Sequence, residues 1–184
     1  MKDLQIKGMK TDSKIVEFYL GKTTDNRGRS IEEIWQWDHE LLERTHDYIQ
    51  WLFPLPEVSR FHPHAPILTE ADITRFKSSF GLNTRLTVSL EVILDFYGLS
   101  CQYLDTKNFK IIPAANFPIR KKCWLHWGNH NHLRIGRILK SLQVLGLENY
   151  AQSLLQCLEQ LFILEEGKIT KLTLASWQDA VKAH

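Results

Sequence analysis

Cysteine is scarce in this chain of 184 residues, and its three copies lie far apart. Cys101, Cys123 and Cys157 form no Cys-x-x-Cys pair. An odd, scattered set of this kind argues against a disulfide framework and against a cysteine zinc site. It favours a reducing compartment, so we expect a cytoplasmic protein.

Long apolar runs are also missing. Nowhere do about 18 apolar residues follow one another, so the sequence predicts no membrane-spanning helix. Residues 1–12 are a polar leader that lacks the apolar stretch of a signal peptide. The remaining length suffices for one buried core, and we expect residues 13–184 to form a single domain.

Neither sign of charge is in excess, since 23 basic residues face 21 acidic ones. Proteins that bind nucleic acid usually concentrate more positive charge than this. A nucleic-acid-binding surface therefore remains an alternative that is possible but not favoured, and it would show a steep loss of affinity with salt. That surface would combine Trp124 and Trp127 with the basic residues Arg120, Lys121, Lys122, Arg134, Arg137 and Lys140.

The motifs of common enzymes are absent from the sequence. There is no Gly-x-Ser-x-Gly turn, no glycine-rich phosphate loop and no His-Glu-x-x-His pair. His130 and His132 would point about 200° apart on a helix, so they do not chelate one ion together. The sequence therefore leans away from an enzyme and predicts no cofactor and no metal. A metal-assisted hydrolase that recruits His46 or His62 is a further alternative.

Apolar residues recur with a helical period along most of the chain, which predicts a mainly α single-domain helical bundle. Residues 99–123 are the least regular part and suggest a small irregular or hairpin insert. One long helix is expected from a capping box at Ser30 to Phe53, where Pro54 ends it. Gly81 is expected to break the next helical stretch. The other expected helices cover about residues 13–20, 69–80, 86–97, 129–145, 150–162 and 172–181.

Two dense polar stretches are the candidate site. The first is His46–Pro54 and the second is Asn129–Arg134. The Asn129 side chain is suited to accept a hydrogen bond from the unpaired backbone N–H groups at the start of the helix that follows. A helix start beside Arg134 and Arg137 suits a carboxylate or a phosphate.

Two structural alternatives stay open for these stretches. Arg134 is equally able to pair internally with Asp47 or Glu43, because a partly buried arginine needs a partner. The residues His39, Glu43, His46 and Gln50 are equally consistent with a solvated side of the long helix.

These stretches also carry a family resemblance. The matching segments follow one another in the family's order and are Ile15–Gly21, Asp25–Arg29, His46–Pro56, Ala65–Pro66, Asp95–Leu99 and Asn129–Ile135. In them the sequence resembles the conserved region of the opioid growth factor receptor family. The vertebrate receptor of that name binds a short enkephalin peptide, restrains proliferation and is found around the nucleus with membranes. The resemblance implies a receptor-type module, with peripheral membrane or nuclear association as a possibility.

We therefore expect a ligand-binding pocket where the two polar stretches meet, with a short peptide or a small anionic ligand as the partner. In this hypothesis Arg134 anchors the anion, so that Arg134→Ala weakens binding and leaves thermal stability nearly unchanged. The predicted ligand-binding residues are His46, Asp47, Gln50, Trp51, Asn129, His130, Asn131, His132, Arg134 and Arg137.

Overall fold

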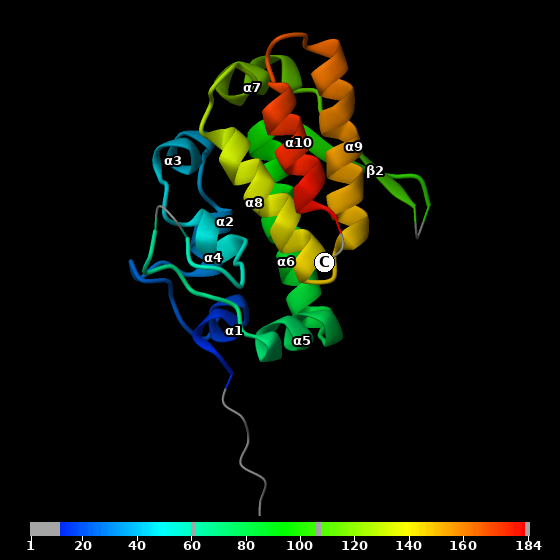
Figure 1. Cartoon of the computed structure of the whole chain (residues 1–184). Coiled ribbons are helices and arrows are strands. Elements are labelled where there is room, and N and C mark those ends of the chain that lie inside the picture. The colour runs from blue at the N-terminus through cyan, green and yellow to red at the C-terminus, as the bar shows by residue number, and fades with distance from the viewer. Residues whose placement is uncertain (1–11, 60–61, 106–107, 183–184) are drawn as a thin grey trace, which may run out of the picture.

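The computed structural model describes residues 12–59, 62–105 and 108–182 (Figure 1). The expected 1–12 leader lies outside these ranges except for Asp12. The described chain is mainly helical with one two-stranded antiparallel sheet, which confirms the predicted fold class. Its elements are α1 (Lys14–Tyr19), α2 (Ile31–Trp35), α3 (His39–Arg44), α4 (Ile49–Leu52), α5 (Glu70–Ser78), α6 (Phe80–Tyr97), β1 (Leu99–Tyr103), β2 (Phe109–Pro113), α7 (Phe117–Trp124), α8 (Asn131–Val144), α9 (Glu148–Leu164) and α10 (Lys171–Ala180).

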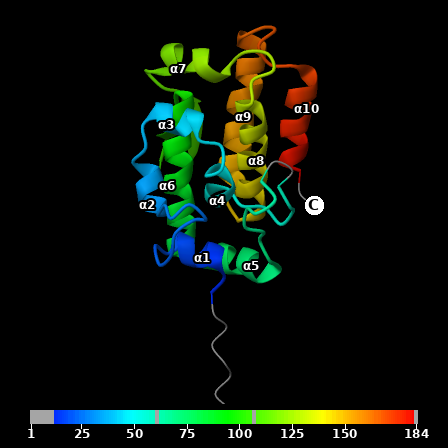
Figure 2. The same cartoon turned by 90° about the vertical axis from the view of Figure 1, so that its left-hand side faces the viewer.

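The long helix α6 is the centre of the arrangement. Helices α8, α9 and α10 run down, up and down beside it, while α2, α3 and α4 cover another flank (Figures 1 and 2). Helices α1 and α5 lie at one end of α6 and α7 lies at the other. The longer helices α6, α8 and α9 each bury an apolar stripe against their neighbours, as the helical period predicted.

The expected long helix over residues 30–53 is wrong, because the structure divides it into α2, α3 and α4. Asp38 begins α3 by accepting a hydrogen bond from the Leu41 amide at 2.7 Å, so it acts as a cap instead of a helix-interior residue. Thr45 is extended and ends α3. The apolar spacing continues through both breaks, which is why periodicity alone did not reveal them.

Two further expectations about boundaries need correction. Gly81 lies inside α6, and the break falls at Ser79, whose hydroxyl accepts from the Leu82 amide. Helix α7 was not predicted, because among its residues only Phe117 and Trp124 are buried and leave no periodic stripe.

The hairpin within residues 99–123 is confirmed. Strands β1 and β2 pair in a register that sets Cys101 opposite Ile111. The Ile111 amide donates to the Ser153 hydroxyl at 2.8 Å, which ties the hairpin to α9.

Two buried tryptophans fix the upper end of the bundle around the start of α8. The Trp124 indole donates to the Tyr97 carbonyl at 2.9 Å, and the Trp177 indole donates to the His132 carbonyl at 2.9 Å. Both rings are almost fully buried. Their position leaves the first turn of α8 facing α3 and α4, where the candidate site lies. None of the helices in the described ranges is long and apolar enough to cross a membrane.

Candidate functional site

The two polar stretches meet through Arg134 of α8. Its guanidinium donates to the backbone carbonyls of Leu42, Glu43 and Thr45 at 3.0, 3.2 and 2.7 Å. It also donates to the His46 Nδ1 at 3.0 Å. Only 6% of the residue is exposed. Arg134 is therefore paired internally, as one of the alternatives held, but its partners are these backbone carbonyls and His46 instead of the Asp47 or Glu43 carboxylate.

Two asparagines support this arginine. Asn129 accepts from the Asn131 amide at 2.8 Å, which is the capping role expected of it. Asn131 is fully buried, accepts from the Arg134 Nη1 at 3.2 Å and donates to the Glu43 carboxylate at 3.1 Å. These contacts lock the start of α8 onto the end of α3.

His46 and His130 lie edge to face beside this network, with ring centroids 5.2 Å apart. The Nε2 of His130 is 3.5 Å from the Glu43 Oε1. Burial, together with the nearby Arg134 charge, lowers the pKa of His130. The imidazole of His130 is therefore neutral at neutral pH.

A cavity of about 550 Å³ opens beside these histidines, between α4, the segment that follows it and the first two turns of α8. One wall is polar and mostly basic, and the other is apolar. The lining residues are His46, Ile49, Gln50, Leu55, Glu57, Val58, Ser59, His62, His130, Leu133, Arg134 and Arg137.

Two polar side chains of this cavity lack partners for some of their atoms within the described part of the chain. The Gln50 Oε1 is buried and accepts no hydrogen bond, although only 6% of that residue is exposed. The Arg137 Nε donates to the Phe53 carbonyl at 2.8 Å, but the buried Nη2 donates to nothing. Burial lowers the pKa of Arg137 to about 10 despite the nearby Glu57, so the side chain still carries its charge at neutral pH.

The sequence matches a known family along nearly its whole length. A sequence model of the opioid growth factor receptor conserved region matches residues 9–182. The chain belongs to the opioid growth factor receptor family. No solved structure matches it.

Curated members of the opioid growth factor receptor family are similar to most of this chain. The mouse opioid growth factor receptor is 42% identical over 142 residues, which are 76% of this chain and 21% of the mouse protein. The human protein is 42% identical over 147 residues, 78% of this chain and 20% of its own length. The opioid growth factor receptor-like protein 1 of Xenopus tropicalis is 40% identical over 145 residues, 77% of this chain and 27% of its own. The chain thus spans about a fifth to a quarter of these relatives.

Within this family fold, half of the predicted ligand-binding residues share the 550 Å³ cavity: His46, Gln50, His130, Arg134 and Arg137. Asn129 and Asn131 lie behind it as supports. Asp47, Trp51 and His132 do not line it. They were grouped with the others because they belong to the two polar stretches, whose residues were expected to face one cavity.

Asp47 and Trp51 line a separate cavity of about 400 Å³. The Asp47 carboxylate accepts from Arg29 at 2.9 Å and from Arg27 at 3.1 Å. Partial burial raises the pKa of Asp47, but the hydrogen bonds from Arg29 and Arg27 outweigh it and lower that pKa. The carboxylate therefore belongs to an ion-pair network of the 25–29 loop.

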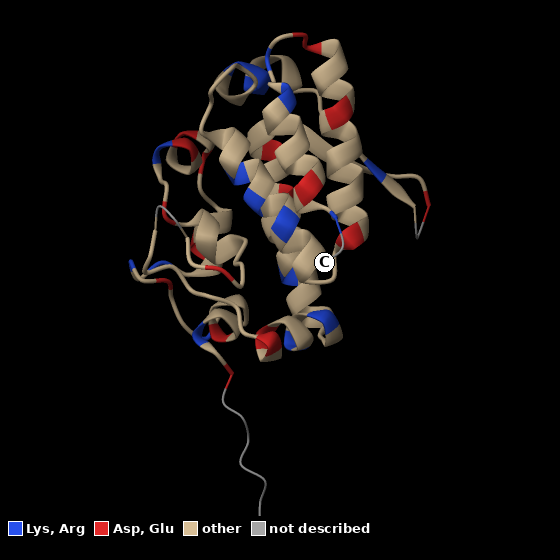
Figure 3. Ribbon diagram, in the orientation of Figure 1, with Lys and Arg blue, Asp and Glu red and all other residues tan. Residues whose placement is uncertain are grey.

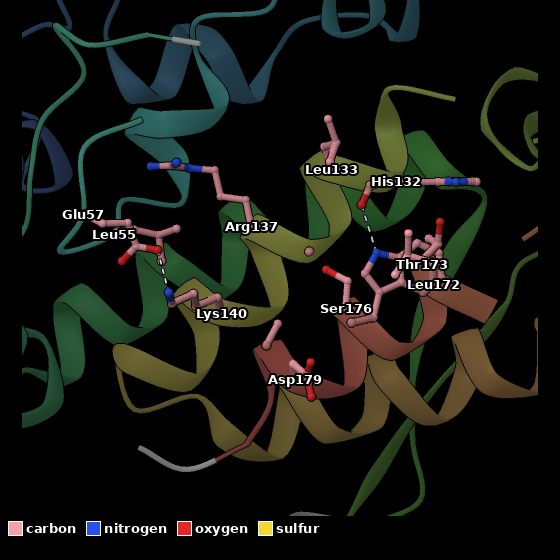
Figure 4. Close-up of a pocket in the computed structure, with 13 residues that line it drawn as sticks. Leu55, Glu57, His132, Leu133, Arg137, Lys140, Leu172, Thr173, Ser176 and Asp179 are labelled. Carbon is pink, nitrogen blue, oxygen red and sulfur yellow. Dashed lines mark hydrogen bonds and ion pairs between the residues drawn. The ribbon is translucent and has the colours of Figure 1, made fainter. Parts of the chain in front are cut away.

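His132 turns toward α10, where its ring lies between Trp124 and Trp177. Together with Leu133 and Arg137 it borders a cavity of about 650 Å³ between α8 and α10 (Figure 4). In this view the Arg137 side chain reaches away from α10 and toward α4.

Acid should destabilise this family domain through His132. Burial lowers the pKa of this imidazole, although one ring N–H donates to the Trp124 carbonyl. Because the folded state then takes up a proton less readily than the unfolded state, the free energy of unfolding should fall as the pH drops below about 6.5. Urea midpoints at about pH 7.5 and about pH 5 should differ less in His132→Asn than in the unmodified protein. Equal differences would contradict this assignment.

Sequence reasoning missed the apolar wall of the cavity, which Ile49, Leu55, Val58 and Leu133 form. The available signal was the proline-rich stretch after Phe53, which an ordered connection packed beside α8 explains. No group of three or more histidine, cysteine or acidic side chains in the described ranges is placed to hold a metal ion.

Proposed function

We propose that this opioid growth factor receptor-like domain is a binding module for a short peptide or a small anionic ligand, held in the 550 Å³ cavity. The observation that carries the proposal is the buried Gln50 Oε1, which has no partner in the described chain. A buried polar atom without a hydrogen bond costs about 1–3 kcal/mol, and a bound ligand that donates to it removes that cost.

The charge of the cavity supports an anionic ligand. Among the described residues, the charged side chains that line it are Arg134, Arg137 and Glu57, so positive charge is in excess. The arginines of α8 are followed by Lys140, so that basic residues are spaced along this helix (Figure 3). A positive wall of this kind attracts a carboxylate and raises its local concentration.

The names of the relatives agree with a receptor role, since the mouse and human proteins are called receptors of an opioid growth factor. Because this chain covers only about a fifth of them, the proposal concerns the class of ligand and not one named peptide.

A surface for nucleic acid has less support. Five of its six expected basic residues bind groups of the protein itself, among them Arg120, which donates to the Phe96 carbonyl, and Lys121, which donates to Glu165. The other three are Arg134, Arg137 and Lys140.

The test is a titration with a randomised tetrapeptide library, followed by backbone and side-chain amide NMR. Peak shifts should gather at Gln50, at the segment after α4 and at the first turns of α8. Val58→Trp, at an exposed position of the cavity rim, should abolish these shifts by filling the cavity. Ile163→Trp is the matched control, because Ile163 is 75% exposed on α9 and outside the cavity lining. Shifts that are absent, or that persist in Val58→Trp, would refute the proposal.

A further inference from the structure

We infer that the ligand is the C-terminal end of a peptide with an apolar last residue. Its carboxylate binds the Arg137 guanidinium, the amide N–H of its last residue donates to Gln50, and its last side chain lies on the apolar wall. This inference rests on the proposed function and specifies its ligand. Three separate features of the cavity lead to it.

The first feature is Arg137, an arginine whose terminal nitrogens make no hydrogen bond within the described residues. The hydrogen bond from Nε to the Phe53 carbonyl fixes the orientation of the Arg137 guanidinium between α8 and the end of α4 (Figure 4). Within the described residues, neither of its terminal nitrogens has a hydrogen-bond partner. The two terminal nitrogens of a guanidinium match the two oxygens of a carboxylate, so a bidentate pair forms without moving the side chain's anchor.

The acidic residue that lines the cavity with this arginine is engaged elsewhere. Glu57 accepts from Lys140 at 2.5 Å (Figure 4). The charge of Arg137 therefore has no direct acidic partner among the described residues, and a buried charge without one is costly.

The second feature is the side-chain amide of Gln50, whose buried Oε1 accepts no hydrogen bond within the described chain. A carboxylate or sulfate does not satisfy its carbonyl, because such anions only accept hydrogen bonds. A peptide's last residue supplies both complements, since its carboxylate accepts from an arginine and its own N–H donates to a carbonyl. Capture of a C-terminal carboxylate is a recurring mode of peptide recognition.

The third feature is an apolar surface left open next to these groups. Leu133 is 66% exposed and Val58 is 59% exposed, while Leu55 lies buried beneath them. A leucine-sized side chain seated here removes apolar surface from water, at about 25 cal/mol per Å². The volume of about 550 Å³ lies within the usual range for ligand sites.

The experiment compares N-acetyl-Leu-Leu as a free acid with the same dipeptide as a C-terminal carboxamide, by calorimetry and NMR titration. The acid should bind about tenfold more tightly than the amide, as expected for one charge-assisted contact. Arg137→Gln should abolish this difference and leave binding of the amide nearly unchanged. Glu57→Gln removes the acidic lining residue, and should tighten binding of the acid a few-fold without affecting the amide.

Equal affinities for the acid and the amide would overturn the inference, and so would a preference that survives in Arg137→Gln. In either case the proposed function stands if the tetrapeptide library still shifts peaks at the cavity. Sodium sulfate that competes fully with the acid would also overturn it, because it would show that any anion suffices. If the library and both dipeptides leave the cavity unperturbed, the proposed function fails together with the inference.

Discussion

Replacing Arg134 by methionine should lower the free energy of unfolding by about 3 kcal/mol or more. Methionine keeps the apolar stem but removes every donor of the guanidinium. The carbonyls of Leu42, Glu43 and Thr45 then lose a hydrogen bond each, and within the described chain only the Leu42 carbonyl keeps another, from the Tyr48 hydroxyl. An acceptor left unsatisfied costs about 1–3 kcal/mol, so the two carbonyls that lose their partner account for most of the effect. Urea denaturation followed by circular dichroism measures the loss, which is a large part of an ordinary domain's stability of about 5–15 kcal/mol.

Arg137→Met is the matched control, because it removes an arginine from the same helix one turn later. Arg137 makes one hydrogen bond to the backbone, with the Phe53 carbonyl, so its replacement should cost only about 1 kcal/mol. Similar losses for the two variants would contradict this division of roles. A near-normal stability for Arg134→Met would instead return the side chain to the anion-binding role that the sequence suggested.

The division of roles between these arginines was beyond the reach of the sequence. They are three residues apart, so periodicity places both on the same side of α8. Which of them meets the end of α3 depends on where the preceding helices break. The sequence indicated that the two polar stretches would combine, and the contacts of Arg134 confirm that they do.

The break at Thr45 is also what buries Gln50. On one continuous helix, Gln50 would follow Glu43 and His46 along a solvated side. The extended Thr45 reorients the chain so that α4 turns Gln50 inward, while Asp47 lies on another side with Arg29. The sequence gives no strong signal that Thr45 is extended, because threonine is found both at helix ends and in loops.

Helix ends that depend on one residue type were easier to predict. Ser13 and Thr69 cap the starts of the helices expected at about residues 13–20 and 69–80, and Gly98 caps the end of the one expected at 86–97, so the structure confirms these three ends. Helix α7 was not predicted because contacts with α6 hold it in position, such as the hydrogen bond from Arg120 to the Phe96 carbonyl, and these join residues far apart in the sequence.

Gly98→Ala should be the most disruptive glycine replacement, with a loss of about 3 kcal/mol or more in unfolding free energy. Gly98 ends α6 with a φ of 75°, which costs an L-residue about 1–2 kcal/mol. An added Cβ would also lie 2.7 Å from the Phe117 Cα and 2.8 Å from the Arg120 Cβ. Both are atoms of α7 close to its backbone, so the helix has to move, and overpacking of this kind adds about 1–3 kcal/mol.

Gly167→Ala separates the two contributions. Gly167 has nearly the same φ, 73°, but an added Cβ there meets nothing within 4 Å, so only the backbone cost of about 1–2 kcal/mol is expected. Urea denaturation of both variants measures the difference in unfolding free energy. Equal losses would show that α7 moves aside without an energetic cost. If α7 moves as expected, the hydrogen bond from the Trp124 indole to the Tyr97 carbonyl should weaken, with a change in tryptophan fluorescence in Gly98→Ala alone. Since the turn after Trp124 leads directly into Asn129 and the start of α8, that displacement should reach the ligand cavity and weaken binding of the peptide library, whereas Gly167→Ala should bind it normally.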